Sequence, residues 1–290
     1  MALRLASELG ACIISLDSMQ AYRGMDIGTA KPTRAEQART PHHLIDIADP
    51  AHDLTVAAFQ SAGRRVLDDL AGRDAQAVVV GGSGLHFRAL VDPLDFPPAD
   101  PLVRAEVDSM ADSEAREALL AADLDAAAFV DLENPRRVQR ALEILRLTGA
   151  TPSRRARSAD ARAVRTYQPE YPFTAVGVDP GDAIERRVRA RIEAMLDRGL
   201  LDEVRALAGK LGRNASQAVG YKELLAALTG ASSLEDAVED VVGSTMRLVK
   251  RQRTFFRRDP RITWISWDDD PEIRYTRARA VLQEGASWNS

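Results

Sequence analysis

The 290-residue sequence predicts an α/β fold with a parallel-sheet core and an inserted helical domain. The core follows from short apolar runs that alternate with amphipathic helical segments, as strands and crossover helices do in a parallel sheet. The insertion follows from residues 92–101, where prolines and aspartates crowd a stretch between two patterned regions, as in a linker. A helical stretch comes after this linker, and a further apolar strand follows it.

Apolar periodicity assigns the elements of the first half of the core. The paired isoleucines of residues 11–17 are typical of a buried parallel strand, and residues 75–84 form a second such run that ends in a glycine turn. Residues 55–72 place apolar side chains near one helical face. In chain order we expect a helix at 1–9, a strand at 11–17, a strand or extended segment at 42–47, a helix at 55–72, a strand at 75–84 and a helix from residue 85.

The second half is mostly helical. In chain order we expect helical structure at 101–165, a strand at 173–179, helices at 182–209, 217–228 and 234–256, and a last strand at 262–267. We therefore assign residues 1–97 and 168–290 to an α/β catalytic core with C-terminal helices, and residues 98–167 to a helical insertion.

The composition is typical of a globular protein and does not indicate a disulfide-rich or membrane protein. A net charge of −4, with 45% apolar and 28% charged residues, describes an ordinary globular protein that would meet a polyanion only through local basic patches. The single cysteine, Cys12, forms no internal disulfide and is expected inside a strand. No signal peptide and no run near ~20 apolar residues is present, so we expect a cytoplasmic protein without a membrane segment.

Two features share the position where parallel sheets carry their chemistry. Asp17 follows the first strand, and the turn at Gly81–Gly84 follows the second. Because ligands bind outside the carboxyl ends of the strands in open α/β sheets, these residues predict a site.

Six sequence blocks together indicate a family resemblance. They occur in order over nearly the whole chain: SLDSMQAYRGMDIGTAKP, PHHLIDIADP, VVVGGSGLHFRALVDPLDFPP, NPRRVQRALEILRLTG, AVGYKE and KRQRTFFRRDPRITW. Together they resemble the tRNA dimethylallyltransferases, also called isopentenyltransferases. The resemblance implies a P-loop NTPase-like core whose helical insertion contacts the anticodon stem-loop of tRNA.

The resemblance also implies a reaction. The family transfers a dimethylallyl group from dimethylallyl diphosphate to N6 of adenosine 37, in tRNAs that read codons beginning with U, and pyrophosphate leaves. Mg²⁺ is the expected cofactor because the leaving diphosphate carries several negative charges. The ligands of that metal are not assigned by the sequence. The family implies a monomer.

By similarity Asp17 is the general base. The exocyclic amine of adenine is a poor nucleophile, and a carboxylate that accepts its proton during attack contributes ~10²–10⁴-fold. The resemblance places Asp17 and the following Ser18, Met19 and Gln20 in contact with tRNA. The alternative for Asp17 is a side chain that caps the next turn.

Two further positions come from the same likeness. Ser83 stands where the family usually has Thr, which keeps a hydroxyl near the base, and His86 replaces the usual Tyr without a physical account. Arg104 matches a family arginine at the domain junction near the substrate. Its alternative is a solvated helix charge.

Two basic segments match the tRNA-facing surface of the family. The first consists of Arg136, Arg137, Val138, Gln139 and Arg140, and the second contributes Arg247, Lys250, Arg251 and Arg253. Arginine suits phosphate because its planar fork donates two parallel hydrogen bonds. Three aromatic residues are interleaved with the second segment, and core packing is favoured for them over base stacking: Phe255, Phe256 and Trp264.

The phosphate side of the site departs from the family pattern. The family binds the diphosphate at a nucleotide-binding P-loop, whereas GGSGLHFR lacks the Lys-Ser/Thr ending and no other P-loop motif occurs here. The motif and its strand would stand immediately before the helix ALRLASELG. One explanation, which we favour, is a gene start placed too far downstream, and the other is a degenerate paralogue that no longer catalyses. We expect residues 1–290 to bind diphosphate poorly.

Two rival functions remain open. A catalytically inactive remnant of the family would bind anticodon stem-loops and transfer nothing. A nucleotide kinase-like phosphotransferase would depend even more on a P-loop and leaves RRVQR and GMDIGTAKP unexplained.

Overall fold

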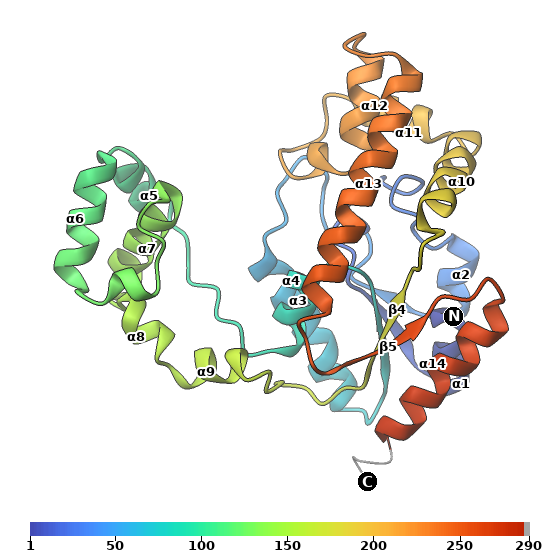
Figure 1. Cartoon of the computed structure of the whole chain (residues 1–290), viewed down its shortest axis with the longest axis horizontal. Coiled ribbons are helices and arrows are strands. Elements are labelled where there is room, and N and C mark those ends of the chain that lie inside the picture. The colour runs from blue at the N-terminus through green and yellow to red at the C-terminus, as the bar shows by residue number, and fades with distance from the viewer. Residues whose placement is uncertain (287–290) are drawn as a thin grey trace. The chain divides into compact units, whose positions relative to one another are not determined.

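The computed structural model describes residues 1–286, which divide into two compact units (Figure 1). The core unit consists of Met1–Leu90 and the chain from Phe173 onward, and the helical unit consists of Val91–Pro172. Across residues 1–286, none of the helices combines the length and the apolar character needed to span a membrane.

The first half of the core unit is a three-stranded parallel sheet in the order β2-β1-β3. Its elements are α1 (Ala2–Leu9), β1 (Cys12–Ser15), α2 (Arg34–Arg39), β2 (His42–His43), α3 (Val56–Ala71), β3 (Ala77–Val80) and α4 (Gly84–Val91). All of β1 is buried, including the free Cys12, as its apolar run predicts. In the central strand Ile13 pairs with both His42 and Val78.

The prediction that 75–84 forms a fully buried strand is wrong. Val79 and Val80 are 36% and 37% exposed. In the described structure β3 pairs only with β1, so its other edge has no strand beside it. β4 (Ala175–Asp179) and β5 (Ile262–Ser266) form a second parallel pair, and within residues 1–286 no strand pairing joins this pair to the first three strands.

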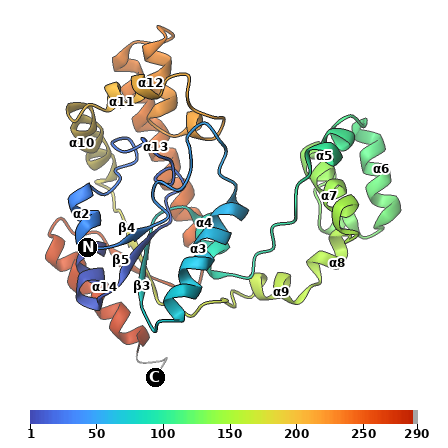
Figure 2. The ribbon, with the colours of Figure 1, turned by 180° about the vertical axis from the view of Figure 1, so that it is seen from behind.

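The C-terminal helices of the core unit are α10 (Ile184–Asp197), α11 (Leu200–Leu207), α12 (Tyr221–Leu228), α13 (Leu234–Phe256) and α14 (Pro271–Ala286). The single helix expected at 182–209 is two helices, because Gly199 adopts φ +94° in the left-handed region and ends the first. Helix α14, which the sequence reading did not assign, lies beside α1 in both views (Figures 1 and 2). There Arg4 bonds to Glu272 at 2.7 Å.

The loop after β1 packs on these helices. Tyr22 and Met25 are buried in one cluster with Ile192, Val204 and Tyr221. The loop Asp17–Pro32 is therefore anchored in this core through Tyr22 and Met25.

The helical unit has its own small core. Its elements are α5 (Pro101–Asp108), α6 (Asp112–Ala122), η1 (Ala126–Ala128), α7 (Pro135–Thr148), α8 (Pro152–Ala156) and α9 (Ala159–Arg165). Val107, Leu119 and Leu142 meet at its centre. The Asn134 side chain caps α7 by accepting the Arg137 N–H. Pro135 suits the first helical position because it has no N–H that would need a partner there.

Candidate active site

The ends of β1 and β3 lie against each other. The Leu16 N–H donates to the Val80 carbonyl oxygen at 2.7 Å, which extends the parallel pairing by one residue. A Cβ added to Gly81 would lie 2.7 Å from the Leu16 carbonyl carbon, so only glycine permits this approach. Asp17 and the turn at Gly81–Gly84 therefore share the carboxyl edge of the sheet, as predicted from the sequence.

Asp17 uses one carboxylate oxygen to hold its own turn. Oδ1 accepts the Met19 N–H at 2.8 Å and a longer contact from the Gln20 N–H at 3.4 Å. No hydrogen bond to Oδ2 occurs among residues 1–286. The capping alternative and the general-base role are thus compatible, because each can use a different oxygen of the same carboxylate.

His86 lies just after the glycine turn, beside Ser83. Its Nδ1 is 2.7 Å from Ser83 Oγ, and its ring meets Phe59 edge-on with centroids 4.6 Å apart. Burial lowers the pKa of the His86 imidazole, while the negative charge of Asp17 opposes that shift. Sequence reasoning offered no account of His86, and the structure assigns it to the Asp17–Ser83 edge.

The loop after Asp17 is held by a buried lysine. Lys31 Nζ lies 2.6 Å from Asp26 Oδ1 and 2.6 Å from Asp46 Oδ1, and it also donates to the Tyr22 carbonyl oxygen. The lysine side chain is almost fully buried, whereas both carboxylates keep contact with solvent. Lys31 therefore ties the middle of the loop, at Tyr22 and Asp26, to the segment at Asp46.

A second tie comes from helix α11. Glu203 accepts the backbone N–H groups of three consecutive residues, Asp26, Ile27 and Gly28, at 3.0, 2.7 and 3.0 Å. The fully buried Tyr221 donates its hydroxyl to the same carboxylate at 2.5 Å. The GMDIGTAKP and AVGYKE blocks thus meet in space, and we call this arrangement the Glu203 clamp.

The other residues predicted after Asp17 are less accessible than expected. The Gln20 side chain is engaged within the loop, because Oε1 accepts from Ser15 Oγ and Nε2 donates to the Thr29 carbonyl oxygen. Met19 packs at the edge of the loop's core cluster. Ser18 is half-buried. In this structure the Gln20 side chain bridges Ser15, at the end of β1, and the Thr29 carbonyl.

Helix α13 brings the second basic segment to the glycine turn. A Cβ on Gly82 would lie 2.4 Å from Gln252 Nε2, and one on Gly84 would overlap the Phe255 ring. The packing of Phe256 on Phe87, with centroids 5.8 Å apart, agrees with the core reading of that aromatic residue. Gln252, which the sequence reading passed over, therefore adjoins the candidate site.

The basic residues of this segment are not equivalent. Lys250 and Arg251 are exposed and have no ion pair with any residue in 1–286, and Arg247 contacts only Ser244. Arg253 instead pairs with Asp179 at 3.3 Å, and Arg257 bonds to the same carboxylate. The Gly181 N–H and Arg257 hold the pKa of the Asp179 carboxyl below its ordinary value. Arg253 is therefore partly neutralised.

The first basic segment surrounds a cavity of about 750 Å³ in the helical unit. Arg136, Arg137 and Arg140 all line this cavity. Val138 does not, because its side chain is 2% exposed and belongs to the core of the unit, so the structure corrects its inclusion as a ligand contact. Gln139 is half-buried.

Arg104 is an exposed residue of α5. Its Nε lies 3.6 Å from Asp108 Oδ2, one helical turn away, and both side chains are exposed. This local arrangement is the one expected of a solvated helix charge. The junction role implied by the resemblance stays a prediction.

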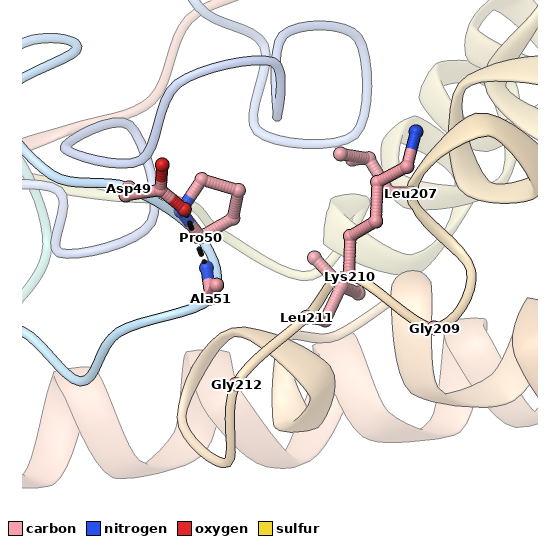
Figure 3. Close-up of a pocket in the computed structure, with 8 residues that line it drawn as sticks. All are labelled: Asp49, Pro50, Ala51, Leu207, Gly209, Lys210, Leu211 and Gly212. Atoms are coloured by element: carbon pink, nitrogen blue, oxygen red, sulfur yellow. Dashed lines mark hydrogen bonds between the residues drawn. The ribbon is translucent and has the colours of Figure 1, made fainter.

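A second cavity, of about 540 Å³, lies in the core unit (Figure 3). It lies between the Asp49–Ala51 turn and the segment Leu207–Gly212. The Gly212 N–H donates to the Pro50 carbonyl oxygen and so joins these two segments. None of the residues predicted for catalysis or RNA contact lines it.

Within residues 1–286, no three His, Cys, Asp or Glu side chains come together in an arrangement that would hold a metal ion. The side chains of this part of the chain therefore do not form a dedicated Mg²⁺ site.

Comparisons with known proteins place these features in context. Residues 20–259 match a family model described as IPP transferase. The chain is 39% identical over 279 residues to a tRNA dimethylallyltransferase of Pseudarthrobacter chlorophenolicus, covering 93% of this chain and 89% of the relative. It is 42% identical over 280 residues to one of a Nocardioides species, covering 93% and 87%.

Solved structures agree with this likeness. The full-length tRNA isopentenylpyrophosphate transferase of Bacillus halodurans is 33% identical, with a TM-score of 0.68 over 99% of this chain and 93% of that one. A eukaryotic dimethylallyltransferase acting on tRNA is 24% identical, with a TM-score of 0.74 over 94% of this chain and 73% of that one. At that identity the second likeness concerns the fold alone.

Proposed function

This chain belongs to the IPP transferase family, as an enzyme of the tRNA dimethylallyltransferase class, and from that premise we propose that it transfers a dimethylallyl group from dimethylallyl diphosphate to N6 of adenosine 37 in tRNA. The observation that carries the proposal is Asp17, at the carboxyl edge of the sheet, with one carboxylate oxygen engaged in its turn and the other available to a ligand.

The proposed chemistry uses Asp17 as the general base. The adenine N6 attacks the first carbon of the dimethylallyl group, the bond from that carbon to the diphosphate oxygen breaks, and Asp17 Oδ2 accepts the proton that N6 loses. The Met19 N–H fixes Oδ1, which orients the carboxylate toward the ligand. We propose that the adenine enters beside the Gly81 turn and Ser83, which lie at the same edge of the sheet as Asp17.

The RNA side of the proposal rests on charge. Lys250 and Arg251 on α13 are exposed and are not neutralised by any residue in 1–286, and the helical unit presents Arg136 and Arg137. Phosphates bind such side chains with strong salt dependence. We propose tRNAs that read codons beginning with U as substrates, a monomer acting in the cytoplasm, and Mg²⁺ held mainly by the diphosphate itself.

The test is a transfer assay with a matched carboxylate control. Asp17→Asn keeps an oxygen for the Met19 N–H but has lost the base, so transfer to tRNA should fall by ~10²-fold or more. Asp49 caps its own turn in the same way, through the Ala51 N–H at 2.9 Å. Asp49→Asn should therefore leave transfer unchanged. Undiminished transfer by Asp17→Asn would remove the base assignment.

A second candidate function is tRNA binding without transfer. It would rest on the exposed Lys250 and Arg251, which suit phosphate binding whether or not transfer occurs. The wild-type chain would then bind an anticodon stem-loop with salt-dependent affinity while prenyl transfer stays at background. Measuring both quantities on the same preparation separates the two candidates.

A further inference from the structure

The hydroxyl of Ser83 bonds to an imidazole. Its Oγ lies 2.7 Å from His86 Nδ1, and no backbone N–H within residues 1–286 donates to it. A serine directly before a helix ordinarily accepts an N–H of the first turn. Here α4 begins at Gly84, and the Ser83 hydroxyl is instead left to the imidazole and to a ligand. Ser83 is only half-buried, so a ligand can reach it.

The ring of His86 is held in one plane. It meets the ring of Phe59 edge-on at 85°, with centroids 4.6 Å apart. Phe59 belongs to α3 and is fully buried. Because a side chain in a close-packed core has little room to move, this contact keeps His86 Nδ1 directed at Ser83.

The available partners decide which nitrogen carries the proton of the neutral imidazole. His86 Nε2 has no hydrogen-bond partner in the described part of the chain, whereas Nδ1 faces the Ser83 hydroxyl. With the proton on Nε2, the hydroxyl donates to Nδ1 and only the Nε2–H is left for water. With the proton on Nδ1, both the hydroxyl proton and Nε2 lack a partner. The first arrangement satisfies more groups, so Ser83 donates to Nδ1.

The surroundings of the imidazole keep it neutral. Burial is the larger influence and lowers the pKa of His86, while Asp17, the charged side chain that acts on the ring among residues 1–286, opposes the shift. Helix α3 faces the ring with the uncharged Phe59, and α13 places the uncharged Gln252 and Phe255 against the neighbouring glycines. His86 Nδ1 is therefore an acceptor at neutral pH.

The chemistry of the target amine calls for two acceptors. Adenine N6 carries two protons, and Asp17 Oδ2 takes the one that is lost. A hydroxyl that donates to His86 keeps both of its lone pairs for a ligand. The glycine turn with Ser83 shares the carboxyl edge of the sheet with Asp17, so Ser83 Oγ is suited to accept the second N–H.

We propose that His86 is a positioning residue for the transfer: it holds the Ser83 hydroxyl proton, so that Ser83 Oγ accepts the second N–H of the adenine amine while Asp17 accepts the first. Two fixed acceptors orient the amine, which directs its nitrogen at the reacting carbon of the donor. This role rests on the proposed function, since it takes adenine N6 as the nucleophile. It also accounts for the histidine at position 86, which the resemblance left unexplained.

The test compares two replacements of His86 in steady-state transfer to an anticodon stem-loop by the full chain. His86→Phe keeps a ring against Phe59 and removes the acceptor. Its kcat should fall about tenfold, the scale of one hydrogen bond, while KM for the stem-loop stays within about twofold of wild type. His86→Asn returns an oxygen acceptor near the place of Nδ1 and should restore kcat to within about threefold of wild type.

Two more readouts show whether His86 acts through Ser83. Ser83→Ala should also lower kcat about tenfold, and adding His86→Phe to it should change kcat by less than about twofold, because the two residues act as one unit. As the pH falls below 6.5, a protonated His86 donates to Ser83 Oγ and frees the hydroxyl proton to turn toward the amine. Wild-type kcat should therefore decline more steeply than that of His86→Asn.

A matched control and a measurement without turnover complete the experiment. His52 is an exposed histidine outside the glycine turn, so His52→Phe should transfer like wild type. Equal kcat in His86→Phe and His52→Phe, or additive losses in the double variant, would refute the positioning role and leave the proposed function standing. Nitrogen-15 spectra of the imidazole report its tautomer, and a proton on His86 Nδ1 at neutral pH would also refute the role. If the wild type transfers nothing, the proposed function fails and this role fails with it.

Discussion

Replacing Glu203 by glutamine tests how the loop carrying Asp17 is held. The Glu203 clamp gathers four donors on one carboxylate: the Asp26 and Ile27 N–H groups bond to Oε2, and the Gly28 N–H and the Tyr221 hydroxyl bond to Oε1. An amide side chain keeps one acceptor oxygen and turns the other position into a donor. Two of the four donors therefore lose their acceptor.

The expected cost follows from those two bonds. A hydrogen bond to a charged group contributes about 1.5–3 kcal/mol, and Glu203 is only half-buried, so water replaces part of the loss. We expect Glu203→Gln to destabilise the loop by about 2–4 kcal/mol. Tyr221→Phe removes one donor and leaves the carboxylate with three amides, so about 1 kcal/mol is expected.

Amide hydrogen exchange is the appropriate assay because the chain has two units and local opening is the quantity of interest. Protection of the Asp26, Ile27 and Gly28 amides should fall most in Glu203→Gln. The control is Asp202→Asn, a neighbour on the same helix whose exposed carboxylate contacts only Arg205, with an expected effect below about 0.5 kcal/mol. Equal exchange in Glu203→Gln and Asp202→Asn would refute the clamp.

Three more outcomes are expected. Gly28→Ala should lower the melting temperature, because its Cβ would lie 2.5 Å from the Tyr221 ring, and an unchanged melting curve would contradict this contact. Wild type should lose stability as the pH falls below 6.5, since the unfolded chain protonates before the half-buried His86, whose folded pKa is lowered. Urea midpoints on either side of that pH should show a smaller loss in His86→Asn, and an equal loss would exclude His86 as the cause. Asp179→Asn should release Arg253 and steepen the salt dependence of stem-loop binding, whereas an unaltered slope would show that this arginine does not meet phosphate.

Much of the core could be predicted because its signals are local. The apolar run at 11–17 contains β1, and the loop after it carries Asp17 at the expected strand end. Where prediction failed, the missing information was non-local. The exposure of Val79 and Val80 depends on which strands pair with β3, and the break at Gly199 depends on a positive φ that periodicity does not report.

The candidate site was predicted only in part, because some of its residues are marked by local sequence signals and others are brought there by packing. Asp17 and Ser83 were found from their blocks, whereas the bond between His86 and Ser83 and the closeness of Gln252 to Gly82 appeared only in three dimensions. Val138 shows the opposite error, because a residue within a matching segment was taken as a contact although helical periodicity turns it into the core.

The sequence by itself determined the family, the carboxylate at the end of the first strand and the basic character of two segments, since these depend on residue identity and short spacing. Only the tertiary structure decided that Glu203 grips the loop at Asp26–Gly28, that Asp179 partly neutralises Arg253, and that arginines and Phe129 enclose one cavity. The physical reason is packing: periodicity reports which face of an element is buried, but the partner on that face is chosen by elements distant along the chain.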